Sequence, residues 1–470
     1  MMGHCMISVI PRYYPEGGWG WVVVAAALLT HTLTSGLLLA GGHIIAPATN
    51  TRLGLDPGHV TGLLVVAGAA CGAQAAAPLT THLASQHSPR LCAFIGSLVA
   101  ALGLLFTSFA RQAHQVIISY CLVLGLGVSL VQASHAVMIG QYFKKRRLHL
   151  EVVLNSWTGL SLSLASVVQH WALRWGGWRL GLQVVAAAAS LGVLTSLLLR
   201  PASVYHPQRH AILHMRQYMR QVLGPNKLKP GARPLADTLA RLRSRSVRVL
   251  AAAGALGAVC LLAPLLCGAT IARADSGEAE SRVLGLQLGL GLAFSVGSYT
   301  AGRVCLVPAS TRARLPCVVA VVCCGLGLVT SQTLASPWPR LLLGAALAGA
   351  ATSSFRVFLY RSARWVTMST DHCPTPPVCR SHYLAVVSLV SCAQAAPALL
   401  SVLLYASCDY GPLWAGVAQL LAGVLMALHC SGLATRKYGT RSATHLFRVS
   451  SNFDIDVNCQ TNCDTNVTFF

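Results

Sequence analysis

The ionisable side chains inside long apolar stretches of the sequence include His31, His135 and Arg303. An Arg guanidinium stays charged and can bind a carboxylate through two parallel hydrogen bonds. A His imidazole titrates near neutral pH, so it can accept and release protons. We therefore expect Arg303 to contact an anionic substrate, and His31 and His135 to contact that substrate or to carry protons.

Each of these residues also has a structural interpretation, and the sequence leaves both open. His31 is followed by Thr34 and Ser35 at i+3 and i+4, and Gln74 falls at a similar depth in the next apolar stretch. Such a polar helix face either lines a cavity or forms hydrogen bonds to a neighbouring helix. Arg303 lies near the end of its stretch, where its long side chain could reach the membrane interface instead.

The remaining polar residues form no constellation typical of an enzyme or a metal site. Paired carboxylates, a nucleophile elbow, a Walker loop and a His-Glu-x-x-His motif are all absent from the sequence. One loop carries His372, Cys373, Cys379 and His382, but its Cys-x5-Cys spacing is longer than that of usual zinc ligands. The sequence therefore predicts no catalytic residue, no metal and no cofactor.

Composition places these residues in a membrane protein. The chain has 470 residues, of which 54% are hydrophobic and only 10% are charged, whereas a soluble domain has about 25% charged residues. The 35 basic residues exceed the 12 acidic ones and give a net charge of +23. They lie at the ends of the apolar stretches rather than on one soluble face, which argues against nucleic-acid binding.

Twelve apolar stretches are long enough to span a bilayer. They cover residues 19–45, 59–83, 91–111, 115–141, 149–171, 178–199, 249–272, 283–307, 315–335, 340–360, 383–406 and 411–432. We therefore expect an all-α membrane protein in which twelve transmembrane helices form two six-helix halves. The expected units are an N-terminal half (1–199), a basic linker (200–248), a C-terminal half (249–435) and a tail (436–470).

Charge also predicts how the chain is oriented, because Lys and Arg accumulate in the cytosolic loops of membrane proteins. If both termini are cytosolic, the linker, the tail and most basic clusters fall on the cytosolic side. The opposite loops then hold several acids, namely Asp56, Asp275, Glu278, Glu280 and Asp409. We expect a multi-pass protein of the plasma membrane whose two termini are both cytosolic.

Two motifs resemble those of the monocarboxylate transporter family. Residues 16–21, Glu-Gly-Gly-Trp-Gly-Trp, are similar to that family's signature at the first span, and residues 142–147, Tyr-Phe-Lys-Lys-Arg-Arg, to its block before the fifth. The resemblance implies a major-facilitator fold whose two halves rock about a site at the midplane. The motif residues with expected structural or gating roles are Glu16, Gly17, Gly18, Trp19, Trp21, Tyr142, Phe143, Lys144, Arg146 and Arg147.

The two motifs also have physical interpretations of their own. Trp19 and Trp21 suit an aromatic belt at the membrane interface, and the neighbouring glycines allow close packing. The basic cluster is either an orientation signal or a gate latch that pairs with a carboxylate such as Glu151. The sequence leaves the choice between these roles open.

Two departures from the family bear on proton coupling. Proton-coupled members resemble one another in a Lys late in span one and an Asp one turn before the Arg of span eight. The aligned positions here hold Leu39 and Tyr299, and no acidic residue maps to the centre of an expected span. We therefore expect facilitated transport or exchange rather than proton symport. A hydrophobic or aromatic substrate would suit Tyr299.

The predicted function is secondary transport of small monocarboxylates or related organic anions, including amino-acid-like compounds. The predicted substrate contacts are Arg303, His31, Tyr299, Gln74 and His135. The expected partners are the substrate and the lipid bilayer; some family members also need a single-span glycoprotein to reach the surface, which the resemblance leaves open here. The alternative is a transport-inactive receptor or scaffold whose basic linker binds anionic lipids or a cytosolic partner.

Overall fold

Helices account for the regular structure of the described part of the chain. The computed structural model describes residues 14–54, 60–205, 207, 235–258, 266, 280–306, 318–319, 321–322, 325–327, 337–370, 376–407, 416–418 and 420–425. Within these ranges there is no β-strand. A helix satisfies its own backbone hydrogen bonds, so it is the structure that an apolar chain can adopt in lipid. The expected all-α fold class is confirmed.

The helices of the N-terminal part, including two π-helical turns and one short 3₁₀ turn, have the following bounds: α2 (Trp19–His31), η1 (Thr32–Gly36), α3 (Leu37–Arg52), α4 (Val60–Ala75), α5 (Ala77–Gln86), α6 (Pro89–Phe109), α7 (Ala113–Val116), η2 (Ile117–Leu124), α8 (Gly125–Tyr142), α9 (Arg147–Leu197) and η3 (Ala202–Tyr205). The later helices are α11 (Leu235–Ala240), η4 (Arg241–Arg243), α12 (Arg245–Ala258), α14 (Glu280–Leu306), α16 (Pro337–Thr370) and α17 (Pro376–Ser407).

Seven helices of the described residues are long and apolar enough to cross a membrane. The pair α4 and α5, bent by 46° at their junction, makes an eighth if it counts as one span. Much of the expected spans 249–272, 315–335 and 411–432 lies outside the described residues, as do 208–234 of the expected linker and the whole tail 436–470. The expectation of twelve spans, and the expected division into units, therefore stay predictions.

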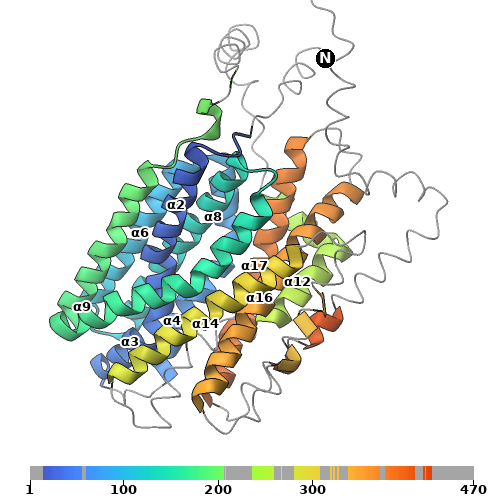
Figure 1. The fold of residues 1–470 in the computed structure, drawn as a ribbon. Helices are drawn as coiled ribbons and strands as arrows, with labels where there is room; N and C mark the ends of the chain where they lie inside the picture. Colours follow the sequence, from blue (N-terminus) through green and yellow to red (C-terminus); the bar gives the residue numbers. More distant parts are fainter. Residues whose placement is uncertain are drawn as a thin grey trace, which may run out of the picture.

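Two expected spans are joined into one long element, α9. The backbone of Gly177 has a φ of 60° and a ψ of −163°, and there the helix reverses its direction. Figure 1 shows the two limbs of α9 running in opposite directions, with the reversal at the lower left. A positive φ costs glycine no steric strain, so the pair Gly176 and Gly177 allows two spans to follow each other almost without a loop.

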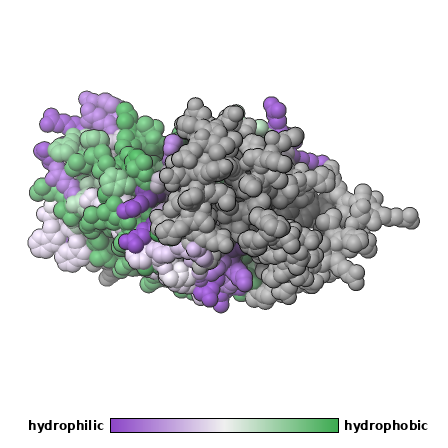
Figure 2. Space-filling view, turned by 90° about the horizontal axis from the view of Figure 1, so that it is seen from above, coloured by the Kyte–Doolittle hydropathy of each residue, from purple (hydrophilic) through white to green (hydrophobic). Residues whose placement is uncertain are grey.

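The helices form two groups that meet along a junction. In Figure 1, α2, α6, α8 and α9 form one side of the bundle, α12, α16 and α17 form the other, and α14 lies where the sides meet. Seen from above, the coloured part of the first group presents a large apolar area bordered by hydrophilic residues (Figure 2).

Small residues let the helices approach closely at this junction. The backbones of α9 and α14 touch at Gly159 and Gly291, because an added Cβ on either glycine would overlap with the other helix. Gly302 of α14 approaches Val152 of α9 and Ser353 of α16 in the same way. In lipid, helices associate through close van der Waals packing rather than through the hydrophobic effect, so these contacts determine how the two groups fit together.

The substitution Gly291→Val tests this packing. Its side chain would overlap with the Ser163 hydroxyl and the Gly159 carbonyl oxygen, and overpacking of this kind costs about 1–3 kcal/mol. We expect the purified variant to melt several degrees below the wild type in differential scanning fluorimetry. Gly285→Val on the same helix is the matched control, because a Cβ at Gly285 meets no atom within 4 Å. Equal losses in the two variants would contradict the close approach.

Candidate functional site

The two sequence motifs contact each other at one end of the bundle. The Glu16 carboxylate accepts hydrogen bonds from the backbone N–H groups of Lys144 at 2.6 Å and Lys145 at 2.7 Å. The Glu16 backbone N–H donates to the Tyr142 carbonyl oxygen at 3.1 Å. One carboxylate thus closes the turn between α8 and α9 onto the start of α2. The acidic position of the first motif and the basic cluster of the second belong to one structural unit, which we call the motif cap.

Aromatic and cationic side chains complete the motif cap. The rings of Trp21 and Phe143 pack edge to face with centroids 5.5 Å apart. Trp19 donates a hydrogen bond to the Leu198 carbonyl oxygen at 3.1 Å, and the Arg200 guanidinium lies 4.3 Å from the centre of the Trp19 ring. A Cβ at Gly20 would come within 2.9 Å of the Phe143 ring, so this position favours a glycine.

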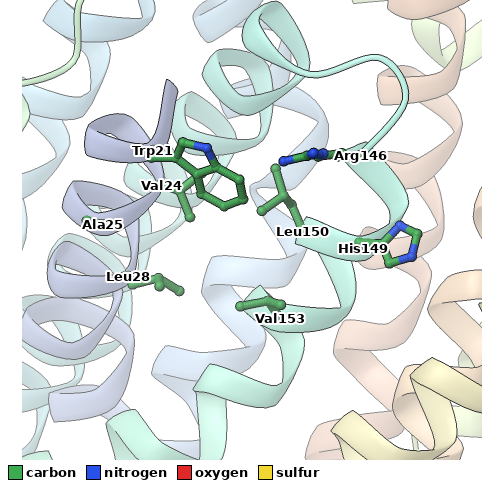
Figure 3. A pocket seen from close by; sticks show the side chains of 8 residues that line it. All are labelled: Trp21, Val24, Ala25, Leu28, Arg146, His149, Leu150 and Val153. Atoms are coloured by element: carbon green, nitrogen blue, oxygen red, sulfur yellow. The ribbon is translucent and has the colours of Figure 1, made fainter. Parts of the chain in front are cut away.

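An open groove of about 510 Å³ lies beside the motif cap, between α2 and the start of α9. Figure 3 shows Trp21 and Arg146 on opposite sides of one end of this groove and Leu28 and Val153 at the other. The remaining lining residues are Val24, Ala25, His149 and Leu150. The groove is mostly apolar, with cationic and imidazole groups only near one end, so it offers no polar cluster that could orient a small anion.

A second polar cluster joins the two helix groups. Arg147 Nε lies 3.1 Å from the Glu151 carboxylate one turn later on α9. The Tyr383 hydroxyl of α17 donates to both oxygens of that carboxylate, at 3.0 and 3.1 Å, and the Arg147 guanidinium stacks 4.4 Å from the Tyr383 ring. Pairing of the basic cluster with Glu151 was one of two interpretations that the sequence left open; Arg147 makes such a pair, and Tyr383 extends it across the junction. Sequence analysis did not predict the role of Tyr383, because Glu151 lies 232 residues away along the chain and no local sequence pattern links the two.

The polar face around His31 contacts other helices of the first group. His31 Nε2 lies 3.3 Å from the Thr158 hydroxyl of α9. Trp157 donates to the Thr32 hydroxyl at 3.0 Å, and Gln132 of α8 donates to Ser35 at 2.9 Å. The π-helical turn η1 follows His31 and carries Thr32 and Ser35. Side chains of this turn therefore accept hydrogen bonds from both α8 and α9.

The five predicted substrate contacts divide into two sets. His31 and His135 lie within electrostatic range of each other, and His135 Nε2 is buried without a hydrogen-bond partner among the described residues. Tyr299 and Arg303 are both exposed on α14, and Gln74 lies on α4 with a buried, unpartnered amide oxygen. No hydrogen bond among the described residues joins these three to His31. Their predicted roles in substrate binding stay predictions.

Sequence analysis missed one cation that the fold brings to the junction, Arg356 of α16. It lines a narrow crevice with Glu151 and Asn155 of α9 and with Ser353 of its own helix. Its guanidinium lies within electrostatic range of His31, Glu151 and Tyr383. The signal that could have found it is the polar Asn155, which lies inside the expected span 149–171.

The match to a known protein family covers most of the chain. The family model described as the Major Facilitator Superfamily matches residues 18–370. The chain belongs to the Major Facilitator Superfamily. Its family is therefore one of multi-pass membrane transporters and not of enzymes. The described helices, from α2 to much of α16, fall inside the matched range.

Individual proteins that resemble this major-facilitator chain match it over fewer residues than the family model does. Monocarboxylate transporter 11 of Mus musculus is 32% identical over 196 residues, which cover 41% of this chain and 43% of the relative. Monocarboxylate transporter 13 of Bos taurus is 28% identical over 190 residues, covering 40% and 44%. The matches span less than half of these relatives. The predicted resemblance is confirmed, since the chain is similar in sequence to monocarboxylate transporters.

A solved structure supports the major-facilitator fold over nearly the whole chain. The nucleoside transporter NupG, solved as a point mutant, superposes with a TM-score of 0.56 and 11% sequence identity. The superposition covers 89% of this chain and 99% of that one. At this identity the likeness concerns the fold alone.

Removal of the Glu16 carboxylate should weaken the motif cap. Glu16→Ala deletes the acceptor of two backbone N–H groups, and hydrogen bonds to charged groups contribute about 1.5–3 kcal/mol each. We expect a lower melting temperature and faster proteolysis between α8 and α9. Glu16→Gln, which keeps one acceptor oxygen, should lose less. A Gln variant as unstable as the Ala variant would assign the effect to charge rather than to these two bonds.

Proposed function

We propose that this chain is a secondary carrier of small monocarboxylates or related organic anions, including amino-acid-like compounds, and that it works by alternating access. The observation that supports this most directly is the polar cluster of Arg147, Glu151 and Tyr383. It crosses the junction between two helix groups in a chain whose relatives are named monocarboxylate transporters. A carrier of this family moves its halves about such a junction.

The path of the substrate would run along the polar faces at the junction. Arg303 is the proposed cation for the carboxylate, and His31, His135, Gln74 and Tyr299 are the proposed neighbours of the rest of the substrate. Gln132 supports a hydrated path near His31, because it is solvent-exposed while it donates to Ser35. A cation that forks onto a carboxylate would give the site its preference for anions.

We propose facilitated transport or exchange rather than proton symport. Leu39 is 7% exposed and packs in the apolar core, so its position supplies no charge. Tyr299 supplies none at the position where proton-coupled relatives are expected to carry an Asp. The proposed location is the plasma membrane, with both termini in the cytosol and the motif cap on the cytosolic side of the bilayer. Whether the chain needs a single-span glycoprotein partner to reach the cell surface stays open.

Uptake measurements test the carrier proposal against the scaffold alternative. Cells with verified surface expression would receive labelled lactate, benzoate and phenylalanine at about pH 6 and pH 8, a range that spans the usual histidine titration. We expect saturable uptake that changes little with pH, is lost in Arg303→Gln and persists when the basic residues of the linker are neutralised. Uptake that rises steeply at acid pH would instead indicate proton coupling through histidine.

The absence of flux for every compound, with the protein at the surface, would contradict the carrier proposal and favour the receptor or scaffold. Loss of a lipid or protein interaction on neutralisation of the linker would then support that alternative. Flux that survives in Arg303→Gln would keep the carrier proposal but remove Arg303 from the substrate path.

The Tyr383 hydroxyl is proposed as part of the latch that holds the two halves together. Tyr383→Phe removes a donor to a carboxylate, which is worth about 1.5–3 kcal/mol. We expect hydrogen exchange in the first turns of α9 to become about tenfold faster or more. The matched control is Tyr120→Phe, since the Tyr120 hydroxyl is buried without a hydrogen-bond partner among the described residues. Unchanged exchange in Tyr383→Phe would contradict the latch.

A further inference from the structure

A crevice at the junction collects hydrogen-bond donors that have no acceptor. It lies between α9 and α16, where Gly302 of α14 lets the three helices approach one another. Asn155 and Ser353 line it and are 2% and 1% exposed. The Asn155 amide nitrogen and the Ser353 hydroxyl have no hydrogen-bond partner among the described residues. Buried polar groups are nearly always paired, so this arrangement indicates a missing acceptor.

Arg356 adds a positive charge to the same crevice. Its side chain is solvent-exposed, yet it lies within electrostatic range of His31 and Glu151 on the facing helices. The guanidinium makes no hydrogen bond or ion pair with a described residue, so all five of its N–H donors are available.

The nearby carboxylate does not compete for these donors in this state. Glu151 also lines the crevice, but its oxygens accept from Arg147 and Tyr383. His31 and Tyr383 also lie in electrostatic range of Arg356. The acceptor whose chemistry matches these donors is a small anion with two or more oxygens, which can bind a guanidinium fork and the neighbouring amide together.

The crevice is too narrow to admit even a water molecule in this state. Asn155 belongs to the first helix group and Arg356 to the second, so separation of the groups would open the space between them. Binding at this place would then depend on the relative position of the two halves. A ligand can shift such an equilibrium only by its differential affinity for the two states, and donors contributed by both halves supply that difference.

We propose that Arg356, Asn155 and Ser353 form a carboxylate subsite of the transported substrate, in addition to the predicted contact at Arg303. The proposal rests on the proposed function, because the carboxylate is that of the transported monocarboxylate. The Arg356 guanidinium binds the carboxylate oxygens, and the Asn155 amide and the Ser353 hydroxyl donate the remaining hydrogen bonds. The positive charge of this subsite comes from Arg356 of α16, whereas the charge predicted from the sequence comes from Arg303 of α14.

Equilibrium binding to the purified full chain tests the subsite. The probes are radiolabelled benzoate and lactate, with benzamide and lactamide as uncharged competitors of the same shape. We expect Arg356→Gln to weaken binding of the acids about tenfold or more, because a charge-assisted fork is lost. Arg356→Lys should lose less, and Ser353→Ala and Asn155→Ala should each weaken binding several-fold. The amides should compete poorly with wild-type protein.

Arg340→Gln is the matched control, because it makes the same change near the other end of α16. Binding of both acids to Arg356→Gln within twofold of the wild type would overturn the subsite, as would equal competition by amides and acids or a wild-type chain that binds neither acid. If Arg356→Gln does not fold, the affinities of Arg356→Lys and Asn155→Ala decide, and unchanged affinity in both overturns the proposal.

Uptake separates this proposal from the proposed function. Wild-type binding that is lost in Arg356→Gln, without any flux, would support an anion site in a chain that is not a carrier. Wild-type flux that is unchanged in Arg356→Gln, at substrate concentrations below saturation, would keep the carrier and remove the subsite.

Discussion

The structure depends on the constraint that a bilayer offers no hydrogen bonds to the chain. Each backbone polar group must find its partner within the protein, so the apolar stretches become helices. The same constraint makes every polar side chain in a span conspicuous, because it must bond a neighbouring helix, bind a ligand or face water. Thr30 illustrates the first solution, since its hydroxyl bonds Ala26 of its own helix and Thr195 of α9. His135, Asn155 and Ser353 show no such solution among the described residues.

Close packing at small residues determines where the polar side chains meet. Gly159 and Gly291 bring α9 against α14, and Gly302 brings α14 against both α9 and α16. Because these backbones touch, short side chains such as Ser353 reach the neighbouring helix. Larger residues at the glycine positions would overlap with the facing helix and push the helices apart. The apolar packing and the polar chemistry of the junction are therefore properties of the same contacts.

The first limb of α9 carries two kinds of interaction. At its start, Arg147 and Glu151 pair with each other and with Tyr383 of the second helix group. Further along, Trp157 and Thr158 contact Thr32 and His31 of the first group. This limb thus connects the motif cap, the junction and the π-helical turn η1. A movement of α9 relative to α16 and α17 would change the junction while it leaves the contacts within the first group intact.

The sequence by itself determined the fold class, because the length and number of apolar stretches leave a polytopic helical protein as the solution. It also determined the two motifs and the spacing that puts Arg147 and Glu151 one helical turn apart, but it left open whether the basic cluster pairs with that carboxylate. It pointed to His31 and His135 by their chemistry alone, and the fold placed these two near each other. Only the tertiary structure decided that Arg356 meets Asn155, that Tyr383 meets Glu151, and that Gly177 turns two spans into one element. Arg356 is far from Asn155 along the chain, and Tyr383 is far from Glu151. Helix periodicity carries no information about which face of one span meets which face of another.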